Sequence, residues 1–308
     1  MKRFIFSLLI IFSLWFAIDR AGELAMWWLN QRSQDTTSPK IKNIVEGLTE
    51  DVILMGTSRC NSHYVSSIIS DTLKMSVYNA GIDGSDNIFA QYMALCYVLQ
   101  KHTPKVICLE VQNSFLEEED DLYHTTGYFA PYFGQCAKAD SVYHMAGTYW
   151  LYKLSHLYRY NTKVLANITG QVKSHWNSEG HGYNPNPKPE VMPELTTLSS
   201  EEMSVNRDKR LYMERFVKAC KENNVFLCFT ISPAYSIVDS SYYSNLKAFA
   251  VLHHIPLLDY HSIGLYTDKP DYFKDSFHFW DKGARLYSSK FACDLNQLIR
   301  ASHKKRQG

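Results

Sequence analysis

The stretch Asp51-Val52-Ile53-Leu54-Met55-Gly56-Thr57-Ser58-Arg59 sets the pattern for the whole 308-residue chain. Its short apolar run has the length of a buried strand, and the Gly-x-Ser at its end would place a hydroxyl at the edge of a sheet. Much later, Asp275-Ser276-Phe277-His278 puts a carboxylate three residues before an imidazole, so that the acid can orient the base. Ser58, Asp275 and His278 are therefore the candidate catalytic residues.

Apolar strands alternate with helical periods on both sides of this stretch. We predict strands over residues 52–55, 75–79, 105–111, 225–231 and 255–259, and helices over 61–73, 87–100, 207–223, 244–252 and 282–299. This order favours right-handed crossovers and a mainly parallel five-stranded sheet in a three-layer α/β/α sandwich. Because ligands bind beyond the carboxyl ends of such strands, Ser58, Gly81, Gln112 and Asn113 are expected near one another.

The N-terminus has the pattern of a membrane signal. Lys2 and Arg3 precede an uncharged apolar run over residues 4–18, and a second apolar stretch covers 24–29. We interpret residues 1–29 as an uncleaved signal anchor whose basic end stays in the cytoplasm, with the rest of the chain extracytoplasmic. The alternative is a cleaved signal peptide, because a spanning helix needs about 17–25 apolar residues.

The remaining chain divides into a polar linker over residues 30–48, an α/β domain over 49–300 and a tail over 301–308. Residues 114–205 interrupt the alternation with an acidic run at 117–121 and many tyrosines. Because so long a structureless loop is rare in a compact domain, we predict an inserted lid or cap with a helical stretch at 141–160. Its aromatic residues are expected to pack rather than to form a sugar platform, and its acidic run to be a solvated loop rather than a metal site.

Composition narrows the function classes. The formal charge of +1 and the lack of a basic stripe give no support for nucleic-acid binding. The seven cysteines form no Cys-x-x-Cys pair, which argues against a zinc site, and nothing in the sequence calls for a cofactor. Cys60, two residues after Ser58, is an alternative nucleophile.

The candidate residues suit nucleophilic chemistry. A serine hydroxyl becomes a useful nucleophile when a base takes its proton, and His278, oriented by Asp275, can be that base. The developing oxyanion needs donors, for which the candidates are the backbone near Ser58, Gly81 and the side chain of Gln112 or Asn113. Ser58 could instead cap a helix. Two further candidates are Arg59, for binding an anion, and His63, for contacting substrate.

Over about residues 50–113 and 205–298 the chain resembles the SGNH, or GDSL, hydrolase superfamily. Gly56-Thr57-Ser58 matches the Gly-Asp-Ser block with Thr in place of Asp, and Asn79-Ala80-Gly81 matches the glycine block. Asp275 and His278 match the final Asp-x-x-His block. The third block, Gly-x-Asn-Asp, corresponds poorly to residues 110–113, so the resemblance puts the oxyanion amide on Gln112 or Asn113.

The resemblance implies an esterase or O-acyltransferase that forms an acyl-serine intermediate. The N-terminal anchor, Gly-Thr-Ser-Arg and the insertion look most like extracytoplasmic members that O-acylate cell-surface polysaccharides. An acylated carbohydrate would then be the substrate, and a membrane-bound O-acyltransferase a partner. The alternatives are a catalytically inactive SGNH-fold protein that binds glycan or serves as a scaffold, and a peptidase.

Overall fold

The computed structural model describes residues 1–33, 35, 37–117, 124–164, 168, 181–198, 204–239 and 241–307. Its centre is a five-stranded sheet in the order β2-β1-β3-β5-β7, with every neighbouring pair parallel. The strands are β1 (Val52–Met55), β2 (Val77–Asn79), β3 (Val106–Glu110), β5 (Phe226–Ile231) and β7 (Leu257–Asp259). The predicted three-layer α/β/α class is confirmed, with the strand order of doubly wound flavodoxin-like sheets.

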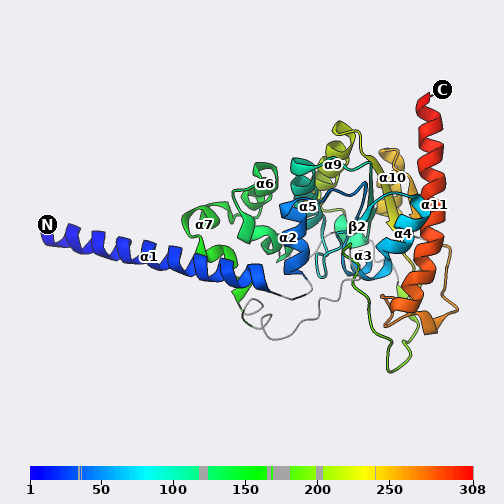
Figure 1. The fold of residues 1–308 in the computed structure, drawn as a ribbon, viewed down its shortest axis with the longest axis horizontal. Helices are drawn as coiled ribbons and strands as arrows, with labels where there is room; N and C mark the ends of the chain where they lie inside the picture. Colours follow the sequence, from blue (N-terminus) through cyan, green and yellow to red (C-terminus); the bar gives the residue numbers. More distant parts are fainter. Residues whose placement is uncertain are drawn as a thin grey trace.

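Helices cover both faces of the sheet (Figure 1). The α-helices of the described residues are α1 (Lys2–Arg32), α2 (Ser38–Glu46), α3 (Ser58–His63), α4 (Ser66–Leu73), α5 (Ile88–Lys101), α6 (Ala137–Met145), α7 (Tyr149–Leu154), α9 (Arg207–Glu222), α10 (Ser244–Leu252) and α11 (Asp281–Gln307). Short 3-10 turns are η1 (Asn113–Phe115), η2 (His124–Tyr132), η3 (Leu157–Tyr160) and η4 (Pro270–Tyr272). A second, two-stranded parallel sheet, β4 (Thr196–Leu198) with β6 (Ser236–Val238), was not foreseen.

Alternation along the strands divides the core between the two faces. In β1, Ile53 and Met55 pack with α2, α5, α9 and α10, whereas Val52 and Leu54 pack with α3, α4 and α11. Since successive side chains of a strand point to opposite faces, a strand buried on both faces must be apolar throughout, as β1 is. The continuous apolar runs in the sequence therefore correspond to the central strands.

One helical prediction needs correction. The helix expected over 61–73 is two helices, broken at Tyr64 and Val65, which have extended backbones. The break is stabilised by tertiary bonds, because Asn79 Nδ2 donates to the carbonyls of Cys60 (2.7 Å) and Tyr64 (2.9 Å), and Val65 N–H donates to Ser288 Oγ (2.8 Å). The bonds that would continue the helix are thus made across the fold.

The expected linker over 30–48 is largely helical. It contains the end of α1 and all of α2, whose Ile41, Ile44 and Val45 are buried in the core. Their i, i+3, i+4 spacing is the signal of an amphipathic helix that the polar neighbours obscured. Residues 301–307 of the predicted tail are likewise helical, because α11 continues to Gln307.

The part of the insertion that contains η2 and α6 packs beside α5, whereas Ser114 and Leu198, near its two ends, lie at the carboxyl edge of the sheet. Phe129, Phe133 and Tyr143 of this segment belong to the same buried cluster as α5, so these aromatic side chains pack as expected. The predicted helical stretch is present as α6, α7 and η3. Most of the acidic run, residues 118–121, lies outside the described residues.

The N-terminal helix has two different halves. Residues 4–18 extend away from the body, largely exposed, as the long blue helix of Figure 1 shows. The second half docks on the insertion. Asp19 is buried and accepts hydrogen bonds from Ser155 Oγ (2.5 Å), His156 N–H (3.0 Å) and Leu157 N–H (3.1 Å). The helix is long and apolar enough to cross a membrane, and it is also joined to the folded domain.

Candidate active site

Ser58, His278 and Asp275 form a hydrogen-bonded chain. Ser58 Oγ lies 2.8 Å from His278 Nε2, although the residues are 220 positions apart in the sequence. His278 Nδ1 lies 2.9 Å from Asp275 Oδ1 and 3.1 Å from Oδ2. Because a carboxylate only accepts, His278 carries its proton on Nδ1, and Nε2 is free to accept from the Ser58 hydroxyl. This is the arrangement of a serine nucleophile with an oriented base.

The turn before Ser58 depends on glycine. Ser58 is the first residue of α3, which follows β1 after only Gly56 and Thr57. Gly56 has φ +149°, and a Cβ there would lie 2.8 Å from the Cβ atoms of both Cys60 and Glu110. A larger residue would therefore displace α3 from the end of the strand, and Ser58 with it.

Asp275 is held by its own loop. Its Oδ1 accepts the backbone N–H groups of Phe277 and His278, each at 2.9 Å. Burial alone would raise the pKa of Asp275, but the hydrogen bond and charge of His278, together with these amides, hold it below its usual value. The carboxylate is therefore ionised at neutral pH and accepts the His278 Nδ1 proton.

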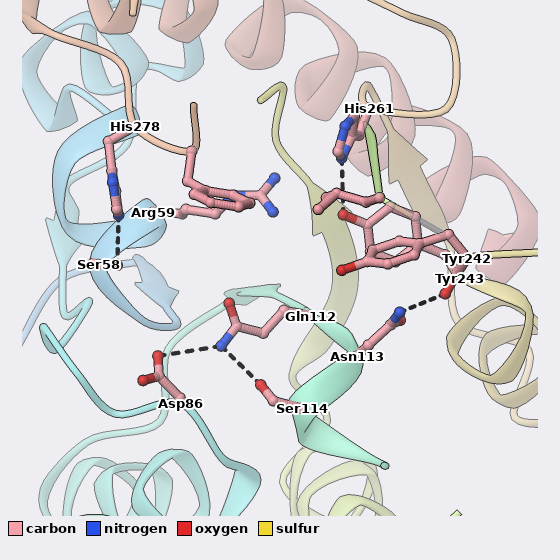
Figure 2. A pocket seen from close by; sticks show the side chains of 12 residues that line it. Ser58, Arg59, Asp86, Gln112, Asn113, Ser114, Tyr242, Tyr243, His261 and His278 are labelled. Atoms are coloured by element: carbon pink, nitrogen blue, oxygen red, sulfur yellow. Dashed lines mark hydrogen bonds between the residues drawn. The ribbon is translucent and has the colours of Figure 1, made fainter. Parts of the chain in front are cut away.

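Ser58 and His278 open into a pocket of about 310 Å³ at the carboxyl edge of the sheet. In Figure 2 they lie on one side of the pocket, opposite Tyr242, Tyr243 and His261. Hydroxyl, amide and ring groups dominate the lining. Parallel sheets generally bind their ligands at this place, beyond the carboxyl ends of the strands.

Arg59 points into the same pocket, but its guanidinium already has an ionic partner. Nη2 lies 3.3 Å from Glu110 Oε1, with both side chains buried, and Nε donates to Ser232 Oγ at 3.3 Å. Burial would lower the pKa of Arg59, but the charge of Glu110 raises it. Burial raises the pKa of Glu110, against which the charge of Arg59 and the hydrogen bonds from Tyr64 and Ser232 favour the carboxylate. An anion in the pocket would have to share Arg59 with Glu110.

Of the predicted oxyanion donors, Gly81, Gln112 and Asn113 all donate to other groups. Gly81 N–H donates to Asn79 Oδ1 (3.0 Å), and a Cβ on Gly81 would lie 2.4 Å from the backbone nitrogen of Asn61, so this glycine allows close packing behind α3. Asn113 Nδ2 donates to the carbonyl of Tyr242 at 2.5 Å. Neither group is turned to Ser58.

Gln112 lines the pocket, with its amide orientation determined by its neighbours. Nε2 donates to Ser114 Oγ (2.9 Å) and Asp86 Oδ1 (3.4 Å), whereas Oε1 accepts from Thr57 Oγ1 (3.4 Å), as Figure 2 shows for the first two. The carboxylate of Asp86 favours the amide nitrogen on its own side. Gln112 therefore presents oxygen, not a donor, toward the residue before Ser58.

Two other candidates lie behind the pocket. His63 is fully buried and does not line the pocket. Its position therefore does not favour the substrate contact predicted for it. Cys60 is buried with its Sγ 3.6 Å from Asn79 Oδ1, and burial, followed by the charge of Glu110, raises the pKa of its thiol. A neutral thiol without access is a poor nucleophile.

Several residues of the site were missed from the sequence. Glu110 is the last residue of β3 and Ser232 follows β5, so both could have been found as polar groups at strand ends. Tyr242 and Tyr243 come from the segment before α10, where no local pattern marks them. His261 comes from the loop after β7, where its spacing from Asp259 favours a turn rather than a site.

Within the part of the chain that the structure describes, no group of three or more His, Cys, Asp or Glu side chains could hold a metal ion. The chain matches no protein-family model and no curated protein. What the site does must therefore be inferred from its own geometry.

Proposed function

We propose that the chain is a serine-dependent ester hydrolase or O-acyltransferase of the SGNH type. The observation that carries this proposal is the Ser58–His278–Asp275 chain, with distances of 2.8 and 2.9 Å, at the wall of an open pocket. Hydrogen-bond reach between nucleophile, base and orienting acid is what such chemistry needs. The order of these residues in the sequence agrees with the resemblance described above.

The proposed reaction has two halves. Ser58 Oγ attacks the ester carbonyl while His278 Nε2 takes the hydroxyl proton. The tetrahedral intermediate then collapses, the carbon–oxygen bond to the alcohol breaks, and His278 returns the proton to that alcohol. Water or an acceptor hydroxyl, deprotonated by His278, next attacks the carbonyl of the acyl-serine. The bond between the acyl carbon and Ser58 Oγ breaks, His278 returns the proton to Ser58 Oγ, and the acid or the new ester is released. Asp275 stabilises the imidazolium in both halves.

The backbone at the start of α3 is the proposed oxyanion donor. The first amides of a helix have no acceptor within the helix, and those of α3 begin at Ser58. The first of these amides belongs to Ser58, and the N–H groups of a first helical turn point out of the helix at its N-terminus. Preorganised donors of this kind stabilise the charge that develops on the carbonyl oxygen.

The lining of the pocket favours a polyhydroxylated substrate. Asp86, Gln112 and Ser114 offer neutral and anionic hydrogen-bonding groups on one wall, and the tyrosine rings 242 and 243 lie on another. Sugars combine hydroxyl groups with apolar ring faces, which suits such a lining. We therefore take an acylated carbohydrate as the substrate class.

The N-terminal helix supports a membrane-attached enzyme. Residues 4–18 are apolar and exposed, while Asp19 ties the next turn to the insertion. Cleavage near residue 20 would remove that buried carboxylate, so we propose an uncleaved anchor. With Lys2 and Arg3 on the cytoplasmic side, the domain would be extracytoplasmic, where a membrane-bound O-acyltransferase could supply acyl groups.

Labelling with a fluorophosphonate probe tests the proposal. The full chain in detergent should be labelled at Ser58, and Ser58→Ala should abolish the signal. Ser289→Ala, an exposed serine on α11, is the matched control and should be labelled at the wild-type rate. Labelling that persists in Ser58→Ala contradicts the assignment of the nucleophile.

A second candidate function is a non-catalytic, carbohydrate-binding scaffold with the same fold. It is favoured by one observation, namely that Gly81, Gln112 and Asn113 all use their donors elsewhere. In that case the wild-type protein would show no labelling and no hydrolysis of an aryl acetate, yet would bind glycan saturably.

A further inference from the structure

A second histidine lies directly behind the catalytic one. The rings of His63 and His278 are 6.2 Å apart, and His63 Nε2 accepts the backbone N–H of Phe279 at 3.0 Å. Phe279 follows His278 in the chain and is itself fully buried. Since an N–H can only donate, His63 must keep Nε2 unprotonated, and its proton is on Nδ1.

The other side of the ring explains why this tautomer is stable. His63 Nδ1 lies 2.8 Å from Ser232 Oγ, and the Ser232 hydroxyl lies 2.8 Å from Glu110 Oε1. A carboxylate accepts, so Ser232 gives its proton to Glu110 and offers its lone pairs to His63. The backbone N–H of Ser232 also donates to Glu110 Oε1 (3.0 Å), which fixes the serine in place.

Glu110, at the end of this network, has a positively charged partner. Arg59 pairs with Glu110 and donates to Ser232, and the Tyr64 hydroxyl donates to the second oxygen of Glu110. Burial, then the charges of Arg59 and His278, lower the pKa of His63 well below its usual value. His63 is thus a neutral imidazole held between a donor on one side and an acceptor on the other.

Without His63 the Phe279 amide would be a buried donor with no partner. A buried donor without an acceptor is destabilising, and the loop can avoid this only by moving. Its movement would displace His278, because the two residues share a peptide bond. An error of about 1 Å in a catalytic group can reduce a rate about 100-fold.

We propose that His63 is a positioning residue that holds His278 beside Ser58, and that the Glu110–Ser232 pair fixes the His63 tautomer. The proposal rests on the proposed function, because it takes His278 to be the base. It also assigns a role to the buried ion pair of Arg59 and Glu110, which holds Ser232 in place rather than binding substrate.

Replacement of His63 tests the first half. His63→Phe keeps the ring but removes the acceptor, and the second-order rate of fluorophosphonate labelling should fall about 10- to 100-fold. His63→Gln, whose carbonyl oxygen can replace Nε2, should recover most of that loss. His253→Phe, a histidine on the far end of α10, is the matched control and should label at the wild-type rate. For an aryl acetate the loss should be in kcat, with KM unchanged.

Long-range proton–nitrogen spectra of the histidine-labelled full chain test the second half. His63 should be protonated on Nδ1 in the wild type, and Ser232→Ala should shift it toward the Nε2 tautomer and slow labelling. Wild-type labelling rates in a folded His63→Phe, or Nε2 protonation in the wild type, would overturn the inference. Absence of labelling in the wild type would instead count against the proposed function, and the spectra would still test the His63 contacts.

Discussion

Asp275 holds His278 twice, once through the side chain and once through the backbone. Its Oδ1 lies 2.9 Å from His278 Nδ1 and 2.9 Å from His278 N, and the amide of Phe277 adds a third donor. The carboxylate therefore orients the ring and shapes the loop that carries it. Asp275 can contact both the backbone N–H and the ring of His278, three residues later, because the loop turns back toward the carboxylate.

Replacing this acid should impair the reaction more than the fold. Asp275→Asn can keep an oxygen in the place of Oδ1 for the backbone amides and His278 Nδ1, but it loses the negative charge that would stabilise the imidazolium and places an amide N–H group near Nδ1 where Oδ2 lies at 3.1 Å. We expect labelling of Ser58 to slow about 100- to 10,000-fold with little change in thermal stability. Asp268→Asn, an exposed acid on the loop before η4, is the control. A rate within a factor of three of wild type would contradict the assigned role.

Gln112 should matter less than an oxyanion donor. Removing such a donor costs about 100- to 1,000-fold in kcat, whereas Gln112 turns its amide nitrogen to Asp86 and Ser114. We expect Gln112→Ala to lower kcat for an aryl acetate less than about 10-fold. A loss near 1,000-fold would mean that the amide turns during the reaction and donates to the oxyanion.

His261 should make the protein sensitive to acid. Burial, followed by the charge of Arg59, lowers its pKa to about 4, while the unfolded chain takes up the proton near 6.5. Between these pH values the unfolded state binds more protons, so stability falls as pH falls. From pH 7 to pH 4 the free energy of unfolding of the wild type should drop about 3 kcal/mol more than that of His261→Gln. Urea titrations at each pH measure this, and equal slopes for the two proteins would refute it.

Asp19 should determine how firmly the N-terminal helix is attached. Asp19→Ala leaves Ser155 Oγ and the amides of His156 and Leu157 without their acceptor. Hydrogen bonds to a charged group contribute about 1.5–3 kcal/mol, so the contact should open. Limited trypsin digestion should then cut faster at Lys153 or Arg159. Ser13→Ala, in the exposed half of the helix, should leave the digestion pattern unchanged.

Much of the fold could be predicted because its signals are local. The predicted strands 52–55 and 225–231 coincide with β1 and β5 to within one residue, since a buried parallel strand must be apolar along its whole length. The break between α3 and α4 could not be predicted. It is stabilised by Asn79 and Ser288, which come from other parts of the chain.

Some features of the candidate site could also be predicted from local sequence, and others could not. Ser58 could be found at a strand end, and Asp275 with His278 by their spacing, because each pattern lies within a few residues. The occupied donors of Gly81, Gln112 and Asn113 depend on partners that only folding brings near.

The sequence by itself determined the sheet, the apolar N-terminal segment and the identity of three residues suited to nucleophilic chemistry, since periodicity and short spacings are local properties. Only the tertiary structure decided that Ser58 and His278 meet at 2.8 Å, that His63 lies behind them and that Asp19 joins the N-terminal helix to the insertion. These contacts join segments that are more than one hundred residues apart. They form because buried polar groups must find partners, and burial is a property of the whole fold.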